Sequence, residues 1–166
     1  MRKILGRRRE ALRGKDEGFT LIELMVVVLI IAILIAIAIP TFLGARQRAQ
    51  NRAAQSDLRN SFTAAKTMYV DQESYLDTDI ATTVATLNGI EPSLTHVDAS
   101  AAAPAGQNVG LVVATATQIL LVRESTSGTW FCIRDTATGA GAGTFYASGA
   151  AFADVDTVAE CAGAAW

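Results

Sequence analysis

The feature that most restricts the fold of this chain is an apolar stretch of twenty-one residues, Phe19 to Ile39, whose one charged side chain is Glu23. As an α-helix rising about 1.5 Å per residue, it would extend roughly 31 Å, close to the thickness of the hydrocarbon layer of a bilayer. We therefore expect a membrane-spanning helix. The part from Leu24 to Ile39 is longer than the usual apolar region of a cleaved secretory signal. Removal of the whole segment at Ala36-Ile37-Ala38, which resembles a signal peptidase site, is the less favoured alternative.

Charge is distributed unevenly along the chain. Residues 1–18 hold seven basic and three acidic side chains, a net charge of +4, whereas the remaining residues hold seven basic and thirteen acidic ones, a net charge of −6. A basic segment before an apolar stretch predicts a cytoplasmic N-terminus and an exported body. A basic arm that binds nucleic acid is the alternative, but no aromatic or folded context accompanies it.

Glu23 does not fit a plain membrane anchor. A carboxylate within an apolar span costs on the order of 3 kcal/mol, so it usually has a partner. The stretch contains no cation, but a cut just before Phe19 would create an α-amino group four residues away, about one helical turn. The position of Glu23 therefore suggests processing, with an ion pair inside one subunit or between neighbouring subunits.

The sequence from Gly18 to Val28, GFTLIELMVVV, resembles the prepilin processing motif of type IV pilins and related secretion pseudopilins. It combines a basic leader, a glycine, a phenylalanine, a glutamate at the fifth place after the glycine, and a long apolar helix with Pro40 near its end. In that family a membrane aspartyl peptidase cuts after the glycine and methylates the new N-terminus. The resemblance implies removal of the leader 1–18 by cleavage between Gly18 and Phe19, formation of N-methyl-Phe19, and a role for Glu23 in assembly.

The helix is expected to continue beyond the apolar stretch. Pro40 lacks an N–H group and crowds the preceding turn, which predicts a kink rather than an end. Apolar residues then recur at spacings of three and four, which predicts an amphipathic helix to about Gln72 and a total length on the order of 80 Å. We expect residues 19–44 to form a transmembrane or filament-core segment, and 45–166 the rest of the helix and a globular head. The recurring residues are Ala54, Leu58, Phe62, Ala65 and Tyr69.

Downstream patterns predict a small sheet that covers this helix. β-Branched and aromatic residues form runs separated by turn residues, so we expect an antiparallel sheet of three or four strands and an α+β, pilin-like fold. A short helix is expected near Ile80 to Leu87, with loops at 99–106 and 139–143. The predicted strands are Gly110–Ala116, Gln118–Glu124, Gly128–Arg134 and Thr144–Ala147.

Cys132 and Cys161 are the two cysteines of a chain expected to be exported, which favours a disulfide over two buried thiols. Such a bridge resembles the disulfide-closed variable loop of many pilins. His96 is the one histidine and no CxxC pair occurs, so the sequence predicts no metal site of the cysteine and histidine type and no cofactor.

Four acidic residues between the helix and the sheet suggest a calcium site. Their spacing does not match an EF-hand loop, so a solvated surface is favoured. The residues are Asp71, Glu73, Asp77 and Asp79.

No nucleophile motif, phosphate-binding loop or zinc motif is present, so we do not expect an enzyme. The resemblance implies a structural subunit of a type IV pilus that serves adhesion, motility or surface attachment. Its implied partners are copies of itself, the prepilin peptidase, an assembly platform in the membrane, and membrane lipid before assembly. It would lie in the cytoplasmic membrane with its N-terminus inside and later in an extracellular pilus.

Two alternatives remain open. The first is a pseudopilin of a type II secretion system or a DNA-uptake pilin; the net acidic charge after the leader argues mildly against nucleic-acid binding. The second is an anchored extracellular binding domain that does not polymerise.

Overall fold

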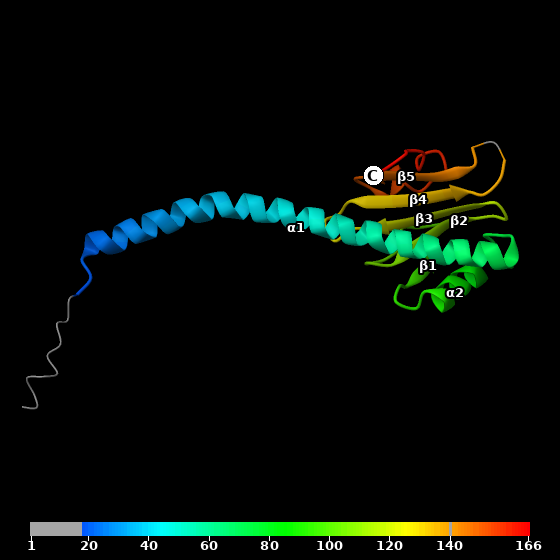
Figure 1. Cartoon of the computed structure of the whole chain (residues 1–166), viewed down its shortest axis with the longest axis horizontal. Coiled ribbons are helices and arrows are strands. Elements are labelled where there is room, and N and C mark those ends of the chain that lie inside the picture. The colour runs from blue at the N-terminus through cyan, green and yellow to red at the C-terminus, as the bar shows by residue number, and fades with distance from the viewer. Residues whose placement is uncertain (1–17, 140) are drawn as a thin grey trace, which may run out of the picture. The chain divides into compact units, whose positions relative to one another are not determined.

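The computed structural model describes residues 18–139 and 141–166 (Figure 1), so the predicted basic leader, apart from Gly18, lies outside the described residues. The chain divides into two compact units between Leu43 and Gly44. In chain order the elements are α1 (Leu21–Gln72), α2 (Ile80–Ile90), β1 (His96–Asp98), β2 (Val109–Ala114), β3 (Gln118–Glu124), β4 (Trp130–Thr136), β5 (Gly143–Gly149) and the 3-10 helix η1 (Phe152–Asp154).

The first helix, α1, is continuous over 52 residues and contains Pro40. It begins two residues after the predicted start at Phe19 and ends at the predicted Gln72. Although proline removes one backbone donor, helical structure continues on both sides of it. The hydroxyl of Thr41 donates a hydrogen bond of 3.0 Å to the carbonyl of Ile37 in this region. The kink at Pro40 stays a prediction.

The second half of α1 buries one face in the globular unit. Of the predicted face, Ala54, Leu58 and Ala65 are almost completely buried there, whereas Phe62 and Tyr69 are partly buried. Met68, beside that face, is also buried. The helix ends at Gln72, and Glu73 adopts a left-handed backbone conformation with φ of 53°. The backbone N–H of Glu73 still donates to the carbonyl of Tyr69 at 2.8 Å.

The described residues form one sheet with the order β1-β2-β3-β4-β5. The predicted α+β architecture is confirmed, but the predicted count of three or four strands is too low. The additional strand, β1, pairs in parallel with β2, whereas the other pairs are antiparallel. A strand of three residues contains too little alternation to be recognised in the sequence. The observed strands also shift the predicted bounds: β4 begins at Trp130, and β5 extends to Gly149.

The sheet separates two apolar clusters because successive side chains of a strand point to opposite faces. In β3, Leu121 packs in the cluster that includes Leu58 of α1, whereas Leu120 packs with Cys132, Val155 and other residues of the second cluster. Both faces of the central strands are therefore covered. Figure 1 shows the second half of α1 and α2 on one side of the sheet. On the other side, Val155 and Cys161 of the C-terminal segment pack in the second cluster, whereas Trp166 packs in the cluster of α1.

Candidate functional site

The first unit presents an uncovered apolar helix. Every described residue from Gly18 to Leu43 is exposed, and Phe19 retains 87% of its accessible surface. Within the described residues, α1 is the one helix that is long and apolar enough to cross a membrane. Its most apolar stretch of 18 residues has no buried residue. A helix that is apolar on all sides requires lipid or other apolar helices around it.

Glu23 lies in the first turn of α1 and forms a capping box with Thr20. Its Oε2 accepts hydrogen bonds from the backbone N–H of Thr20 at 2.8 Å and from the Thr20 hydroxyl at 2.7 Å. In return, the backbone N–H of Glu23 donates to Oγ1 of Thr20 at 3.3 Å. The carboxylate is thus held beside the residue that follows Phe19. Thr20 is not among the predicted site residues, although the pattern Thr-x-x-Glu before an apolar run is a signature of this motif.

The predicted processing residues precede the helix. Gly18 and Phe19 are exposed, and Gly18 has open space around it, with nothing within 4 Å of an added Cβ. Gly18 and Phe19 are joined in this chain, so the α-amino partner predicted for Glu23 is not present in it. Pairing of these two groups stays a prediction.

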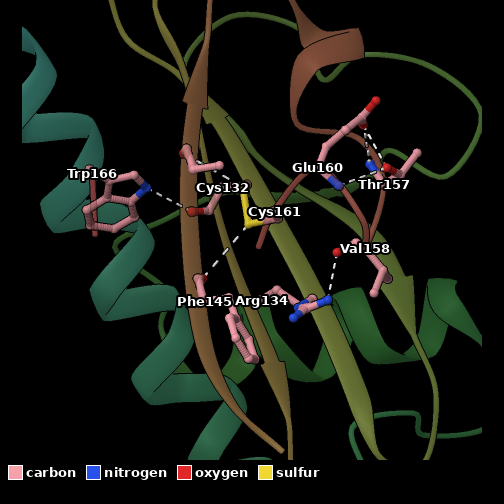
Figure 2. Close-up of a disulfide and its surroundings, with 9 residues drawn as sticks. Cys132, Arg134, Phe145, Thr157, Val158, Glu160, Cys161 and Trp166 are labelled. Atoms are coloured by element: carbon pink, nitrogen blue, oxygen red, sulfur yellow. Dashed lines mark hydrogen bonds between the residues drawn. A yellow bond between two sulfur atoms is a disulfide. The ribbon is translucent and has the colours of Figure 1, made fainter. Parts of the chain in front are cut away.

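A disulfide joins Cys132 of β4 to Cys161, as predicted, and both residues are buried (Figure 2). Hydrogen bonds reinforce the attachment of the C-terminal segment: the indole of Trp166 donates to the carbonyl of Cys132 at 2.8 Å, and Nη1 of Arg134 donates to the carbonyl of Val158 at 2.6 Å. The segment that follows β5 is therefore held against the sheet covalently and by hydrogen bonds.

Asp135 of β4 is the centre of a polar network that the sequence does not predict. Its carboxylate accepts hydrogen bonds from Lys66 at 2.7 Å, from Tyr75 at 2.6 Å and from Thr144 at 2.8 Å. Burial alone would raise the pKa of Asp135, but these donors outweigh it and hold the pKa below its ordinary value. The network ties α1 and the residue Tyr75 to the β4–β5 pair.

His96 has a structural role. Its Nε2 is hydrogen-bonded to the hydroxyl of Ser61 on α1, and its Nδ1 lies 3.1 Å from Oδ1 of Asn88 on α2. The neutral ring satisfies both contacts when Nδ1 carries the proton. Burial lowers the pKa of His96, and the charge of Glu91 opposes this shift. Ser61 is completely buried, so the group is not accessible to a substrate.

Two of the four acidic residues considered for calcium, Asp77 and Asp79, serve as local hydrogen-bond acceptors. Asp79 caps α2 by accepting from the backbone N–H of Thr82 at 2.7 Å. Asp77 accepts from the hydroxyl of Thr86 at 3.0 Å. Across residues 18–139 and 141–166, no group of three or more His, Cys, Asp or Glu side chains could hold a metal ion.

Comparison with known proteins identifies a motif in the N-terminal region. Residues 13–39 match the family model described as the prokaryotic N-terminal methylation motif. The chain is 44% identical over 63 residues to the type IV major pilin protein PilA of Myxococcus xanthus, which covers 38% of this chain and 29% of that protein.

Two further relatives match over 65 residues, or 39% of this chain. One is the type II secretion system core protein G of Pectobacterium carotovorum, at 31% identity and 42% of its length. The other is the type IV wide pilus major component PilA4 of Thermus thermophilus, at 32% identity and 50% of its length. The chain thus spans half or less of the curated relatives it matches, and no solved structure matches it.

Proposed function

Because the methylation motif and these relatives support a type IV pilin-like precursor, we propose that this chain is a structural subunit of a type IV pilus. The observation that carries the proposal is the uncovered apolar helix of the first unit, which holds one carboxylate near its start. Such a surface is stable in a bilayer before assembly and among the same helices of other copies after assembly. The second unit would supply the surface of the filament.

Processing would occur between Gly18 and Phe19. The exposure of both residues and their position before the first turn of α1 support access by a membrane peptidase. Cleavage would remove the basic leader 1–18 and leave an α-amino group at Phe19, one residue from Thr20. Since Thr20 holds the Glu23 carboxylate at the same end of the helix, the new cation and this carboxylate could pair within one subunit or between subunits.

The chain would occupy two locations in turn. The precursor would span the cytoplasmic membrane with its basic leader inside, and the mature subunit would join an extracellular filament through an assembly platform. In this function the chain acts mechanically, through helix packing and surface contacts, without a catalytic step. Adhesion, motility and surface attachment are the roles that such a filament would serve.

Intact-mass and N-terminal analysis of the protein from membranes or sheared filaments of its host tests the proposal. We expect a chain that begins at N-methyl-Phe19. A retained leader would favour the non-polymerising anchored domain. A start near Pro40 would instead identify a secreted domain that has lost its apolar segment, and it would overturn the filament proposal.

A pseudopilin is the second candidate, because one of the relatives is a type II secretion core protein at 31% identity. All three similarities cover 63 to 65 residues of this chain, so they do not extend over the whole globular unit. Deletion of the gene in its host separates the candidates. Loss of surface filaments with normal protein secretion supports a pilin, whereas loss of secretion supports a pseudopilin.

A further inference from the structure

Three arginines directly follow the apolar part of α1. Between Glu23 and Asp57 the charged residues are Arg46, Arg48 and Arg52, and no acidic residue interrupts them. All three arginines are exposed. The segment is therefore a concentrated positive charge adjoining a long apolar surface.

The other basic side chains of residues 18–139 and 141–166 all have partners. Lys66 pairs with Asp135 at 2.7 Å, and Arg123 pairs with Asp57 at 2.8 Å. Arg59 lies over the ring of Trp166 at 4.9 Å, while Arg134 donates to a backbone carbonyl.

By contrast, the three arginines take part in no ion pair, side-chain hydrogen bond or ring contact with any described residue. Asp57, the first acidic residue after them, is already paired with Arg123. Their charge is therefore not neutralised within residues 18–139 and 141–166 and is available to a partner outside them.

We propose that Arg46, Arg48 and Arg52 bind the phosphate groups of anionic phospholipids at the membrane surface before assembly. This inference rests on the proposed function, because it requires the apolar part of α1 to span the bilayer. Arg46, Arg48 and Arg52 follow Leu43 by roughly 4.5, 7.5 and 13.5 Å of helix rise, so the first two lie at about the depth of the head-group layer and the third lies just outside it. The long arginine side chains can extend along the apolar surface and place their guanidinium groups at phosphate level.

Anionic head groups also account for an otherwise unfavourable placement. Basic residues that flank a span on the exported side oppose the orientation set by the basic leader. Attraction to anionic lipid at that surface offsets this effect, since each basic residue near such a membrane contributes a favourable interaction. The lipid would fix the depth of the helix until neighbouring subunits replace it.

Electron spin resonance of spin-labelled lipids tests this inference. The full chain is reconstituted in phosphatidylcholine vesicles that contain a trace of either spin-labelled phosphatidylglycerol or spin-labelled phosphatidylcholine. The fraction of each labelled lipid associated with the protein is measured, and the ratio of the phosphatidylglycerol fraction to the phosphatidylcholine fraction gives the lipid selectivity. We compare the wild type with the triple variant Arg46→Gln, Arg48→Gln, Arg52→Gln. The ratio should fall several-fold in the triple variant, because one arginine near an anionic surface contributes up to roughly fivefold.

Arg59→Gln is the matched control, because it removes an exposed arginine of the same helix whose guanidinium already lies over Trp166. It should leave the ratio unchanged, and high salt should weaken the selectivity of the wild type. The leader is present in every variant, so its charge cancels from the comparison.

An unchanged ratio in the triple variant, or an equal fall in Arg59→Gln, would overturn the proposal. If the triple variant keeps its lipid selectivity but forms no filaments, the arginines instead face acidic neighbours. Processing at Phe19 is measured separately in the host, so failure here leaves the proposed function intact.

Discussion

At the scale of single residues, buried polar side chains connect elements that are distant in the sequence. His96 links β1 to Ser61 of α1 and Asn88 of α2, and Asp135 links β4 to Lys66 of α1. Buried polar groups without partners are costly, so such groups have defined partners on neighbouring elements. These contacts favour one arrangement of helices and sheet over other packings of the same apolar surfaces.

Mild acid should destabilise the globular unit through His96. Its pKa is lowered by burial in the folded state, so the unfolded chain binds a proton more readily. The contribution of the neutral ring is fully present above the unfolded pKa of about 6.5 and is lost as the pH falls through the folded pKa. We expect urea unfolding of the full chain in detergent, followed by tryptophan fluorescence, to show decreasing stability between pH 7.5 and pH 5.

His96→Gln is the control for this effect. His96 is the one histidine of the chain, so the variant removes the group that titrates in this range while it keeps a polar side chain. Its stability should depend less on pH over the same interval, whatever its absolute value. Equal pH dependence in both proteins would show that another group is responsible.

Residue types predict part of the candidate site. Glu23 is conspicuous because it is the one charge in an apolar stretch, and the two cysteines suggest their own pairing. The partners of buried groups are harder to predict. In the sequence, nothing distinguishes Asp135 from other polar strand residues. Its partners Lys66 and Tyr75 lie 69 and 60 residues away in the sequence. No local pattern encodes pairings of such separation.

At the scale of elements, the periodicity of apolar residues predicts long helices and strands well. The bounds of α1 differ from the prediction by two residues at its start, and the bounds of β3 agree with it. β1 is not among the predicted strands because it has three residues and is formed by its pairing with β2. Tertiary context creates this strand, which its own residues do not specify.

Gly110 of β2 has no room for a side chain. A Cβ there would lie 2.7 Å from Cβ of Ala99 and 2.9 Å from side-chain atoms of Pro104 and Val122. We expect Gly110→Ala to reduce the free energy of unfolding by about 1–3 kcal/mol through overpacking, as measured by urea unfolding of the full chain in detergent.

Gly89 is a matched position for the same substitution. It lies in α2, and an added Cβ would meet nothing within 4 Å. Gly89→Ala should therefore raise stability by up to about 1 kcal/mol, because alanine is the better helix former. Similar effects of the two substitutions would contradict the proposed crowding at Gly110.

The disulfide should stabilise the attachment of the C-terminal segment. It closes a sequence separation of 29 residues, for which the entropy model gives roughly 3 to 4 kcal/mol. We expect the double variant Cys132→Ala, Cys161→Ala to lose about this much stability in urea unfolding, and reduced wild type to behave similarly. If reduction lowers stability by less than about 0.5 kcal/mol, the hydrogen bonds of Trp166 and Arg134 are sufficient to hold the segment.

At the scale of the whole molecule, the two units have separate requirements. The globular unit has its own buried clusters, disulfide and polar networks. The exposed apolar unit has no buried residue from Gly18 to Leu43 and needs apolar surroundings that the described residues do not provide. Substitutions near Glu23 should therefore affect assembly without changing the stability of the globular unit.

Two substitutions at Glu23 separate its possible contributions to assembly. Glu23→Ala removes both the carboxylate and the acceptor for Thr20, whereas Glu23→Gln removes the charge but can preserve the capping box. If Glu23 pairs with the new α-amino group of Phe19, both variants should fail to form filaments, as counted by electron microscopy of sheared cells. Intact mass of each variant must show cleavage after Gly18, so that a defect in processing is not mistaken for one in assembly. Normal filaments from Glu23→Gln but none from Glu23→Ala would mean that the start of the helix, rather than the charge, is what assembly requires.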